Sequence, residues 1–146
     1  MSNIVNIVFV WIIDGMRYIS YNINEGNGMA FEIEFYITQD GKNPVSDFLD
    51  SLDDKMAAKL IGLMEVLEDK GTELRKPYSE HIGDGIFELR CKQGSNITRV
   101  LYFFYVGKKI IATNGFVKKT QKTPIGEIKL AKQRRMDWLK RHEREV

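Results

Sequence analysis

Apolar and polar residues first alternate clearly after Met29, where hydrophobic side chains at every second position predict a half-buried strand. Its apolar positions are Phe31, Ile33, Phe35 and Ile37. Asp40-Gly41 ends the strand, and Asn43-Pro44 then supplies a helix N-cap followed by proline at the first helical position. Helical spacing predicts a short helix with the inward residues Val45, Phe48, Leu49 and Leu52, and a second helix with Met56, Leu60, Leu63, Met64 and Leu67. Gly71 ends the second helix.

The second half of the chain predicts three strands and one long helix. After a polar loop that carries Pro77 and Gly83-Asp84-Gly85, the strands span Ile86 to Lys92, Ile97 to Val106 and Lys109 to Val117. Gly94-Ser95 and Gly107-Lys108 are typical of two-residue hairpin turns, so the three strands should form an antiparallel meander. Thr123-Pro124 begins a basic helix that runs to about His142, with Ile125, Ile128, Ala131, Trp138 and Leu139 facing inward. The predicted fold class is α+β: an N-terminal strand, a helical hairpin, the meander and a C-terminal helix.

Residues 1–28 show no clean period, and asparagine and glycine are scattered through them. We interpret them as an N-terminal extension, whose order and native status the pattern does not decide, and residues 29–146 as one domain. A chain of 146 residues with 43% hydrophobic residues is long enough for one core. The apolar run from Ile4 to Ile13 is about half the length of a membrane span, so no membrane association is expected. The single cysteine, Cys91, cannot form an intramolecular disulfide, which favours a reducing, cytoplasmic setting.

The net charge of +2 conceals a strong division along the chain. Up to Gly85 there are 7 Lys and Arg against 15 Asp and Glu, whereas from Ile86 onward there are 15 against 5. Clustered cations bind polyanions by neutralising phosphates and releasing counterions. The division therefore indicates a polyanion-binding half on an acidic scaffold, and solvated helix faces are the equally weighted alternative.

The predicted turns set a register that gathers cations on one face of the sheet. Arg90 lies opposite Arg99, Arg99 lies opposite Phe116, and Lys92 and Lys118 share the face of the arginines. The other face takes Phe87, Leu89, Val100, Tyr102, Phe104, Ile111 and Val117 as a core for the helices. Like charges directly across a ladder are unfavourable, so the pair either holds an anionic ligand or is screened by Glu88 and solvent.

Lys118, Lys119 and Lys122 follow the last strand and are expected to surround the rim of this face. The nearby arginines should lower the pKa of at least one of these lysines, which could then act as a general acid or base near neutral pH. His81 and His142 lie far apart and are interpreted as incidental. One cysteine and two distant histidines make no zinc site, and no phosphate-binding glycine loop is present, so neither a metal nor an organic cofactor is expected.

Three segments resemble the HigB-like, phage-associated branch of the RelE/ParE toxin superfamily. They read DGIFELR, TRVLYFF and GFVKKTQKTPIGEIKLAKQR, and the earlier NPVSDFLDSL fits the first helix of that family. The likeness covers roughly Met29 to Arg141, and its most specific part is the lysine-rich stretch before TPIGEI. It implies a RelE-like fold and a ribosome-dependent endoribonuclease that is neutralised by a cognate antitoxin.

The resemblance also implies roles for single residues. In the family reaction a ribose 2′-hydroxyl attacks the adjacent phosphate, and Arg90 and Arg99 would bind that phosphate. Lys118 and Lys119 would move protons or hold flanking phosphates together with Lys122, and the remaining substrate-binding candidates are Lys92 and Tyr102. Register places Tyr102 on the opposite face, which favours a core role for it. Some superfamily toxins use a histidine near the cleavage site, and this sequence offers no counterpart, so the general base stays open.

The sequence is also compatible with two alternative functions. A ParE-like inhibitor of DNA gyrase would share the scaffold without the RNA chemistry, and the basic sheet face argues against it. An inactive nucleic-acid or partner-binding module would use the same cations only to dock phosphates.

Overall fold

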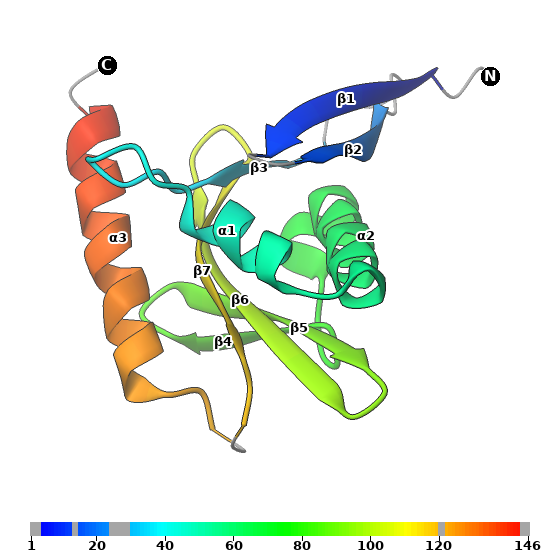
Figure 1. Cartoon of the computed structure of the whole chain (residues 1–146). Coiled ribbons are helices and arrows are strands. Elements are labelled where there is room, and N and C mark those ends of the chain that lie inside the picture. The colour runs from blue at the N-terminus through cyan, green and yellow to red at the C-terminus, as the bar shows by residue number, and fades with distance from the viewer. Residues whose placement is uncertain (1–3, 13–14, 24–29, 120–121, 144–146) are drawn as a thin grey trace.

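The computed structural model describes residues 4–12, 15–23, 30–119 and 122–143, and its main body is a five-stranded sheet with helices on both faces (Figure 1). The strands of this sheet are β3 (Glu32–Phe35), β4 (Ser79–Gly83), β5 (Ile86–Gln93), β6 (Asn96–Tyr105) and β7 (Lys109–Val117). Their order is β3-β7-β6-β5-β4. β3 runs parallel to β7, and the other neighbours are antiparallel. The α+β class and the predicted meander are confirmed, within a larger mixed sheet.

Local capping explains where the first two helices begin and end. α1 (Pro44–Ser51) starts after Asn43, whose side chain accepts a hydrogen bond from the amide of Ser46 at 3.1 Å. In α2 (Asp54–Lys70), Asp53 caps the amide of Met56 at 2.8 Å. Gly71 follows α2 with a φ of 54°, begins the short 3-10 helix η1 (Gly71–Glu73), and has no room for a side chain beside the ring of Phe31.

Two hydrophobic clusters lie on opposite faces of the sheet. α1 and α2 cover one face, and α3 (Ile125–Glu143) covers the other (Figure 1). The predicted stripes of α1 and α2 are buried or half-buried against the first cluster. On α3, Ala131 and Trp138 are buried as predicted, but Ile125 is 72% exposed, because it lies at the very start of the helix.

One hairpin has the predicted loop and the other does not. Gln93 pairs with Asn96 around Gly94-Ser95, which confirms the two-residue turn. Tyr105 pairs with Lys109, so the second loop has the extra residue Val106. An irregularity between Leu101 and Tyr102 compensates for this extra loop residue. There the pairing advances by one residue on β6 but by two residues on β7, as in a β-bulge.

This compensation restores the predicted pairing of Arg99 with Phe116 but reverses the faces of part of β7. Ile110 and Ala112 therefore join the cluster under α1 and α2, and Ile111 lies in the cluster under α3. The prediction that Ile111 shares a face of the sheet with Tyr102 was wrong for this reason. Val117 was also wrongly predicted as core, since it is 48% exposed at the end of its strand.

Two regions contain strands that the hydrophobic pattern did not predict. Part of the predicted loop before Ile86 is β4, an edge strand paired with β5. Within residues 1–28, β1 (Ile4–Ile12) and β2 (Gly15–Ile23) form an antiparallel sheet of their own. Their separation from the main sheet is compatible with an extension, and the boundary at residue 29 stays a prediction.

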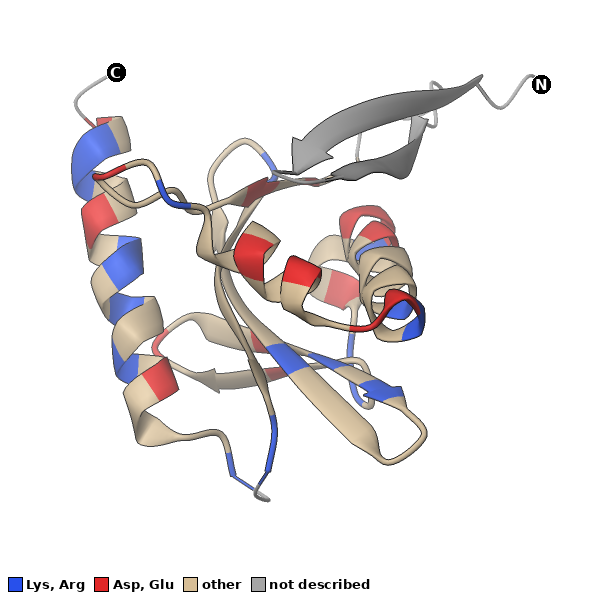
Figure 2. Cartoon of the chain, viewed as in Figure 1, with Lys and Arg blue, Asp and Glu red and all other residues tan. Residues whose placement is uncertain are grey.

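Charge is also divided in space. Acidic residues recur along α1 and α2, whereas α3 and the lower parts of β5, β6 and β7 carry most of the basic ones (Figure 2). Some cations of α3 have fixed partners: Lys132 lies 2.7 Å from Asp84, and Arg141 lies 2.8 Å from Asp137. A second group of basic residues lies at one end of the sheet, on β5, β6 and after β7.

Candidate functional site

Strand pairing brings Arg90 and Arg99 side by side on the α3 face of the sheet. Arg90 of β5 is the direct partner of Arg99 of β6, as predicted. The amide of Lys118 donates to the carbonyl of Ile97 at 2.8 Å, which continues the β6–β7 ladder beyond the end of β7. By alternation Lys118 then shares the face of Arg99. The predicted convergence of the three cations is thus present in the backbone register.

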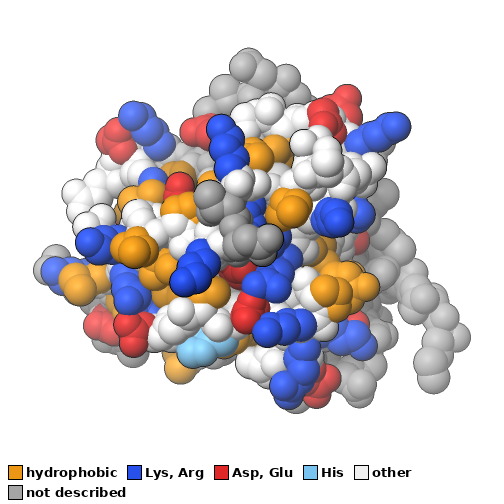
Figure 3. Space-filling view, turned by 90° about the horizontal axis from the view of Figure 1, so that it is seen from below, with side chains coloured by type: hydrophobic (Ala, Val, Ile, Leu, Met, Phe, Trp, Pro, Cys, Tyr) orange, Lys and Arg blue, Asp and Glu red, His pale blue; other side chains and the backbone are white. Residues whose placement is uncertain are grey.

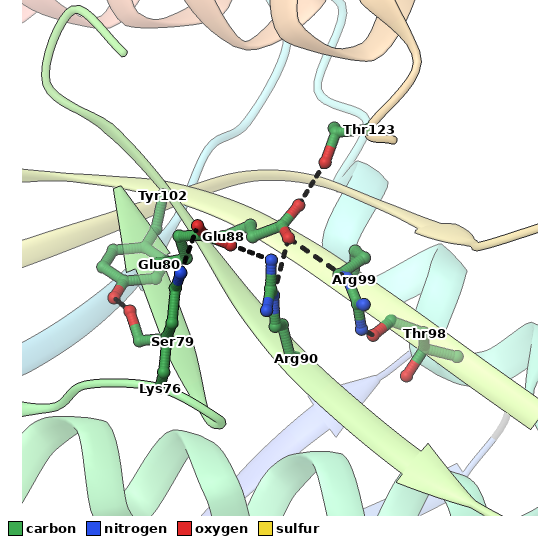
Figure 4. Close-up of polar contacts among 9 residues, drawn as sticks. All are labelled: Lys76, Ser79, Glu80, Glu88, Arg90, Thr98, Arg99, Tyr102 and Thr123. Carbon is green, nitrogen blue, oxygen red and sulfur yellow. Dashed lines mark hydrogen bonds and ion pairs between the residues drawn. The ribbon is translucent and has the colours of Figure 1, made fainter. Parts of the chain in front are cut away.

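A buried carboxylate occupies the centre of this group (Figure 4). Glu88 is 1% exposed, and its Oε1 accepts a hydrogen bond from Arg90 Nε at 2.8 Å and lies 3.3 Å from Arg99 Nε. Its Oε2 accepts a hydrogen bond from the hydroxyl of Thr123, at the end of the loop that leads into α3. The sequence left two explanations for the arginine pair, an anionic ligand or screening by Glu88. The side-chain contacts show that Glu88 screens the pair.

Arg90 has a second acidic partner at the surface. Its Nη2 contacts Glu80 Oε2, and Glu80 Oε1 lies 3.0 Å from Lys76 Nζ (Figure 4). Glu80 comes from β4, directly opposite Glu88 on β5, so the two carboxylates share one face. The result is a ladder of alternating charges that crosses three strands.

The two arginines differ in their access to solvent. The side chain of Arg90 is 27% exposed and that of Arg99 only 8%. Burial lowers the pKa of Arg99, and the Glu88 carboxylate opposes this effect. Arg99 also donates to the carbonyl of Thr98 at 3.2 Å. Arg90 is consequently the guanidinium that can meet a ligand, while Arg99 contributes charge from beneath it.

The lysines after β7 also divide into different positions. Lys118 is half-buried, and its pKa is lowered, first by burial and then by the charge of Arg99. The expectation of a lowered lysine pKa is confirmed, although burial contributes more than the arginines do. Lys92, Lys119 and Lys122 are exposed.

An open pocket adjoins the charged ladder, between β4, β5 and the start of α3. Its lining comprises Glu80, His81, Ile82, Glu88, Arg90, Lys122, Thr123 and Ile128. Figure 3 shows this end of the molecule, where Lys and Arg side chains gather around a few acidic ones. Lys122 lines this pocket, in agreement with its predicted position at the rim of the basic face.

The sequence did not single out Glu80 or Thr123 as members of the site. The pattern predicts a loop around Glu80 and only the start of a helix at Thr123. The position of Glu88 beside the arginines could be predicted, because residues two apart on a strand share a face and Glu88 precedes Arg90 by two.

Three other residues weighed from the sequence lie apart from the ladder. Tyr102 is 1% exposed on the α1–α2 side, where its hydroxyl contacts that of Ser79, and burial raises its pKa to about 12. The ring of His81 packs on Phe87 with centroids 4.8 Å apart, and its Nε2 accepts from the amide of Gly85 at 3.0 Å. His142 stacks on Trp138 near the end of α3.

Among the residues that the structure describes, no group of three or more His, Cys, Asp or Glu is arranged to hold a metal ion. No helix in the described part of the chain is long and apolar enough to cross a membrane.

Fold and site together define a small α+β protein with a basic cluster, bridged by carboxylates, at one end of an antiparallel meander. Residues 47–136 match the phage-derived protein family described as Gp49-like (DUF891), and the chain belongs to this family. The family is associated with RelE-type toxins of toxin–antitoxin systems, which implies an antitoxin as partner. No curated protein matches the chain in a sequence comparison.

Proposed function

We propose that this protein is the toxin of a type II toxin–antitoxin system, of the HigB-like phage-associated branch, and that it cleaves messenger RNA on the ribosome. In the proposed reaction a ribose 2′-oxygen attacks the adjacent phosphorus while the bond from phosphorus to the 5′-oxygen breaks. The products are a 2′,3′-cyclic phosphate and a free 5′-hydroxyl. The protein must bind the phosphate, stabilise its added charge and transfer two protons.

The observation that carries the proposal is the position of Arg90 at the edge of an open pocket. Glu88 and Glu80 hold its guanidinium in place, and its side chain remains 27% exposed. A held guanidinium can offer two N–H groups to phosphate oxygens without losing further side-chain entropy. We assign Arg90 to the scissile phosphate.

The charge balance of the site supports an anionic ligand even though the arginines already share Glu88. Four cations, Arg90, Arg99, Lys118 and Lys122, stand against the two carboxylates Glu80 and Glu88. The excess of positive charge favours a phosphate that carries developing negative charge. Arg99 strengthens this field from below.

Lysines complete the proposed assignment. Lys118, whose pKa is lowered by burial and by Arg99, would donate a proton to the leaving 5′-oxygen. Lys119, Lys122 and Lys92 would hold flanking phosphates. Tyr102 receives no role, because its hydroxyl is buried on the other face. In the resting cell an acidic or amphipathic segment of the antitoxin would mask the basic rim.

Translation of a defined message in a bacterial extract tests the proposal. Wild-type protein should cut ribosome-bound message at defined sites, and Arg90→Ala and Lys118→Ala should each lower the cleavage rate by about 10²-fold or more. Lys140→Ala removes an exposed cation near the far end of α3 and should cleave like wild type.

Other outcomes would point to the alternative functions. Intact message together with cleaved plasmid DNA would favour the ParE-like gyrase inhibitor. Growth inhibition that survives both substitutions, with only RNA affinity reduced, would favour a module that binds without cutting.

A further inference from the structure

Glu80 lies where a carboxylate can reach a ligand held by Arg90. It projects from the edge strand β4 into the open pocket, and its side chain is 29% exposed. One of its oxygens contacts Arg90, and the other lies 3.0 Å from Lys76 Nζ (Figure 4). Lys76 can therefore hold the Glu80 carboxylate in place when a phosphate binds the guanidinium of Arg90.

The proposed cleavage requires a group that removes the proton of the 2′-hydroxyl. Among the described residues that line the pocket, Glu80, Glu88 and His81 carry side chains that can accept a proton at neutral pH. Glu88 is 1% exposed and engaged by Arg90, Arg99 and Thr123. Both of its oxygens are therefore already engaged, and almost none of the residue is open to solvent.

His81 is engaged in a different way. Its Nε2 already accepts the amide hydrogen of Gly85, and its ring packs on Phe87, a residue of the α1–α2 side of the sheet. His81 is paired with Phe87 in the ladder, whereas Glu80 is paired with Glu88 on the opposite face. Glu80 is thus the proton acceptor that is both accessible and adjacent to Arg90.

We infer that Glu80 is the general base of the cleavage, an inference that rests on the proposed function. The carboxylate takes the proton from the 2′-hydroxyl as the oxygen forms its bond to phosphorus. The bond from phosphorus to the 5′-oxygen breaks, and that oxygen receives a proton from the Lys118 ammonium. One proton enters Glu80 and one leaves Lys118, so the site is reset by exchange with water.

The contact between Glu80 and Arg90 supplies the geometry that this step needs. The 2′-hydroxyl of RNA is attached next to the carbon that bears the phosphate, so base and phosphate-binding group must be neighbours. A phosphate on Arg90 places that hydroxyl beside Glu80. Because Glu80 already contacts Arg90 Nη2, part of this contact must break when the phosphate of RNA binds the guanidinium.

The test compares Glu80→Gln with wild type in single-turnover cleavage of message on purified, programmed ribosomes across a range of pH. The amide keeps the shape of the side chain but accepts no proton, so cleavage should slow by about 10²- to 10⁴-fold. RNA binding should be retained or strengthened, since Arg90 loses a competitor. The fall in wild-type rate toward low pH should disappear in the variant.

Two further variants keep this test decisive. Glu80→Asp keeps a carboxylate on a shorter side chain and should cleave partially, with the fall at low pH preserved. Glu73→Gln neutralises an exposed carboxylate on η1 and should match wild type. Thermal unfolding of each variant monitors folding, and the partly exposed pair should contribute little to it.

Other results separate the two levels of the proposal. If Glu80→Gln cuts as fast as wild type or faster, Glu80 merely competes with phosphate for Arg90, and the inference is wrong. A slower variant whose rate still falls toward low pH as in wild type would also overturn it, because Glu80 would then only position Arg90. If wild type and Glu73→Gln leave ribosome-bound message intact, the proposed function itself fails.

Discussion

Arg90 and Arg99 are direct partners across the β5–β6 ladder, and their guanidinium groups converge on the single carboxylate of Glu88. Two like charges in such positions repel each other, and a buried anion between them turns the repulsion into two attractive contacts. The geometry of the basic cluster therefore depends on an acidic residue.

Glu88→Gln should destabilise the fold strongly. Removing one partner of a buried ion pair leaves uncompensated charge, here on the buried Arg99, since Arg90 keeps its contact with Glu80, and typically costs about 3 to 5 kcal/mol. Urea unfolding at neutral pH measures the loss. Glu80→Gln serves as the matched comparison, because its partly exposed pair should contribute about 1 kcal/mol or less. Equal losses in the two variants would show that the burial of Glu88 does not matter.

Glu68 on α2 should make stability fall as the pH rises. The residue is 8% exposed, and its carboxyl accepts a hydrogen bond from the amide of Ile33 at 3.1 Å. Burial raises its pKa from 4.5 to about 7, despite that hydrogen bond. Between these values the folded state binds more protons than the unfolded state, so the free energy of unfolding decreases with pH, by about 3 kcal/mol in total.

Glu68→Gln removes this titration and provides the measurement. Unfolding by urea at a series of pH values should show the stability difference moving in favour of the variant between pH 4.5 and about 7. Glu73→Gln, at an exposed site, should leave the pH dependence of wild type unchanged. A constant difference between Glu68→Gln and wild type would contradict the prediction.

Gly115→Ala should destabilise the contact between α1 and β7. A Cβ atom at residue 115 would lie 2.3 Å from the ring carbon Cδ1 of Phe48, so the ring must move. Overpacking of this kind costs about 1 to 3 kcal/mol. Thermal or urea unfolding gives the value, and the smaller side chain of Phe48→Leu should recover part of the loss in the double variant.

A glycine with open space around it offers a control of opposite sign. Gly62 lies on the exposed side of α2 with nothing within 4 Å of an added Cβ. Gly62→Ala should therefore stabilise the protein by about 0.5 to 1 kcal/mol, because alanine loses less backbone entropy in a helix. Similar losses in both variants would show that the ring of Phe48 is not the cause.

Most of the regular elements follow from local signals. The N-caps Asn43 and Asp53, the alternating strands and the turn at Gly94-Ser95 depend on neighbours in sequence, so the pattern of residues predicted them. β4 escaped prediction because Ser79–Gly83 has little strand propensity of its own and is a strand only through its pairing with β5. The predicted length of the loop at Val106 was wrong by one residue. The pairing of Arg99 with Phe116 was still predicted correctly, because the irregularity at Leu101 and Tyr102 cancels that difference.

The fold class, the charge division and the pairing of Arg90 with Arg99 could be predicted from the sequence, because periodicity and a tight turn act over short stretches of chain. Which anions these arginines meet depends instead on long-range packing. Glu80 arrives from an edge strand and Thr123 from the loop into α3, and both contacts join residues far apart in sequence. The same packing buried Arg99 and left Arg90 accessible, since solvent access depends on every element that covers a side chain.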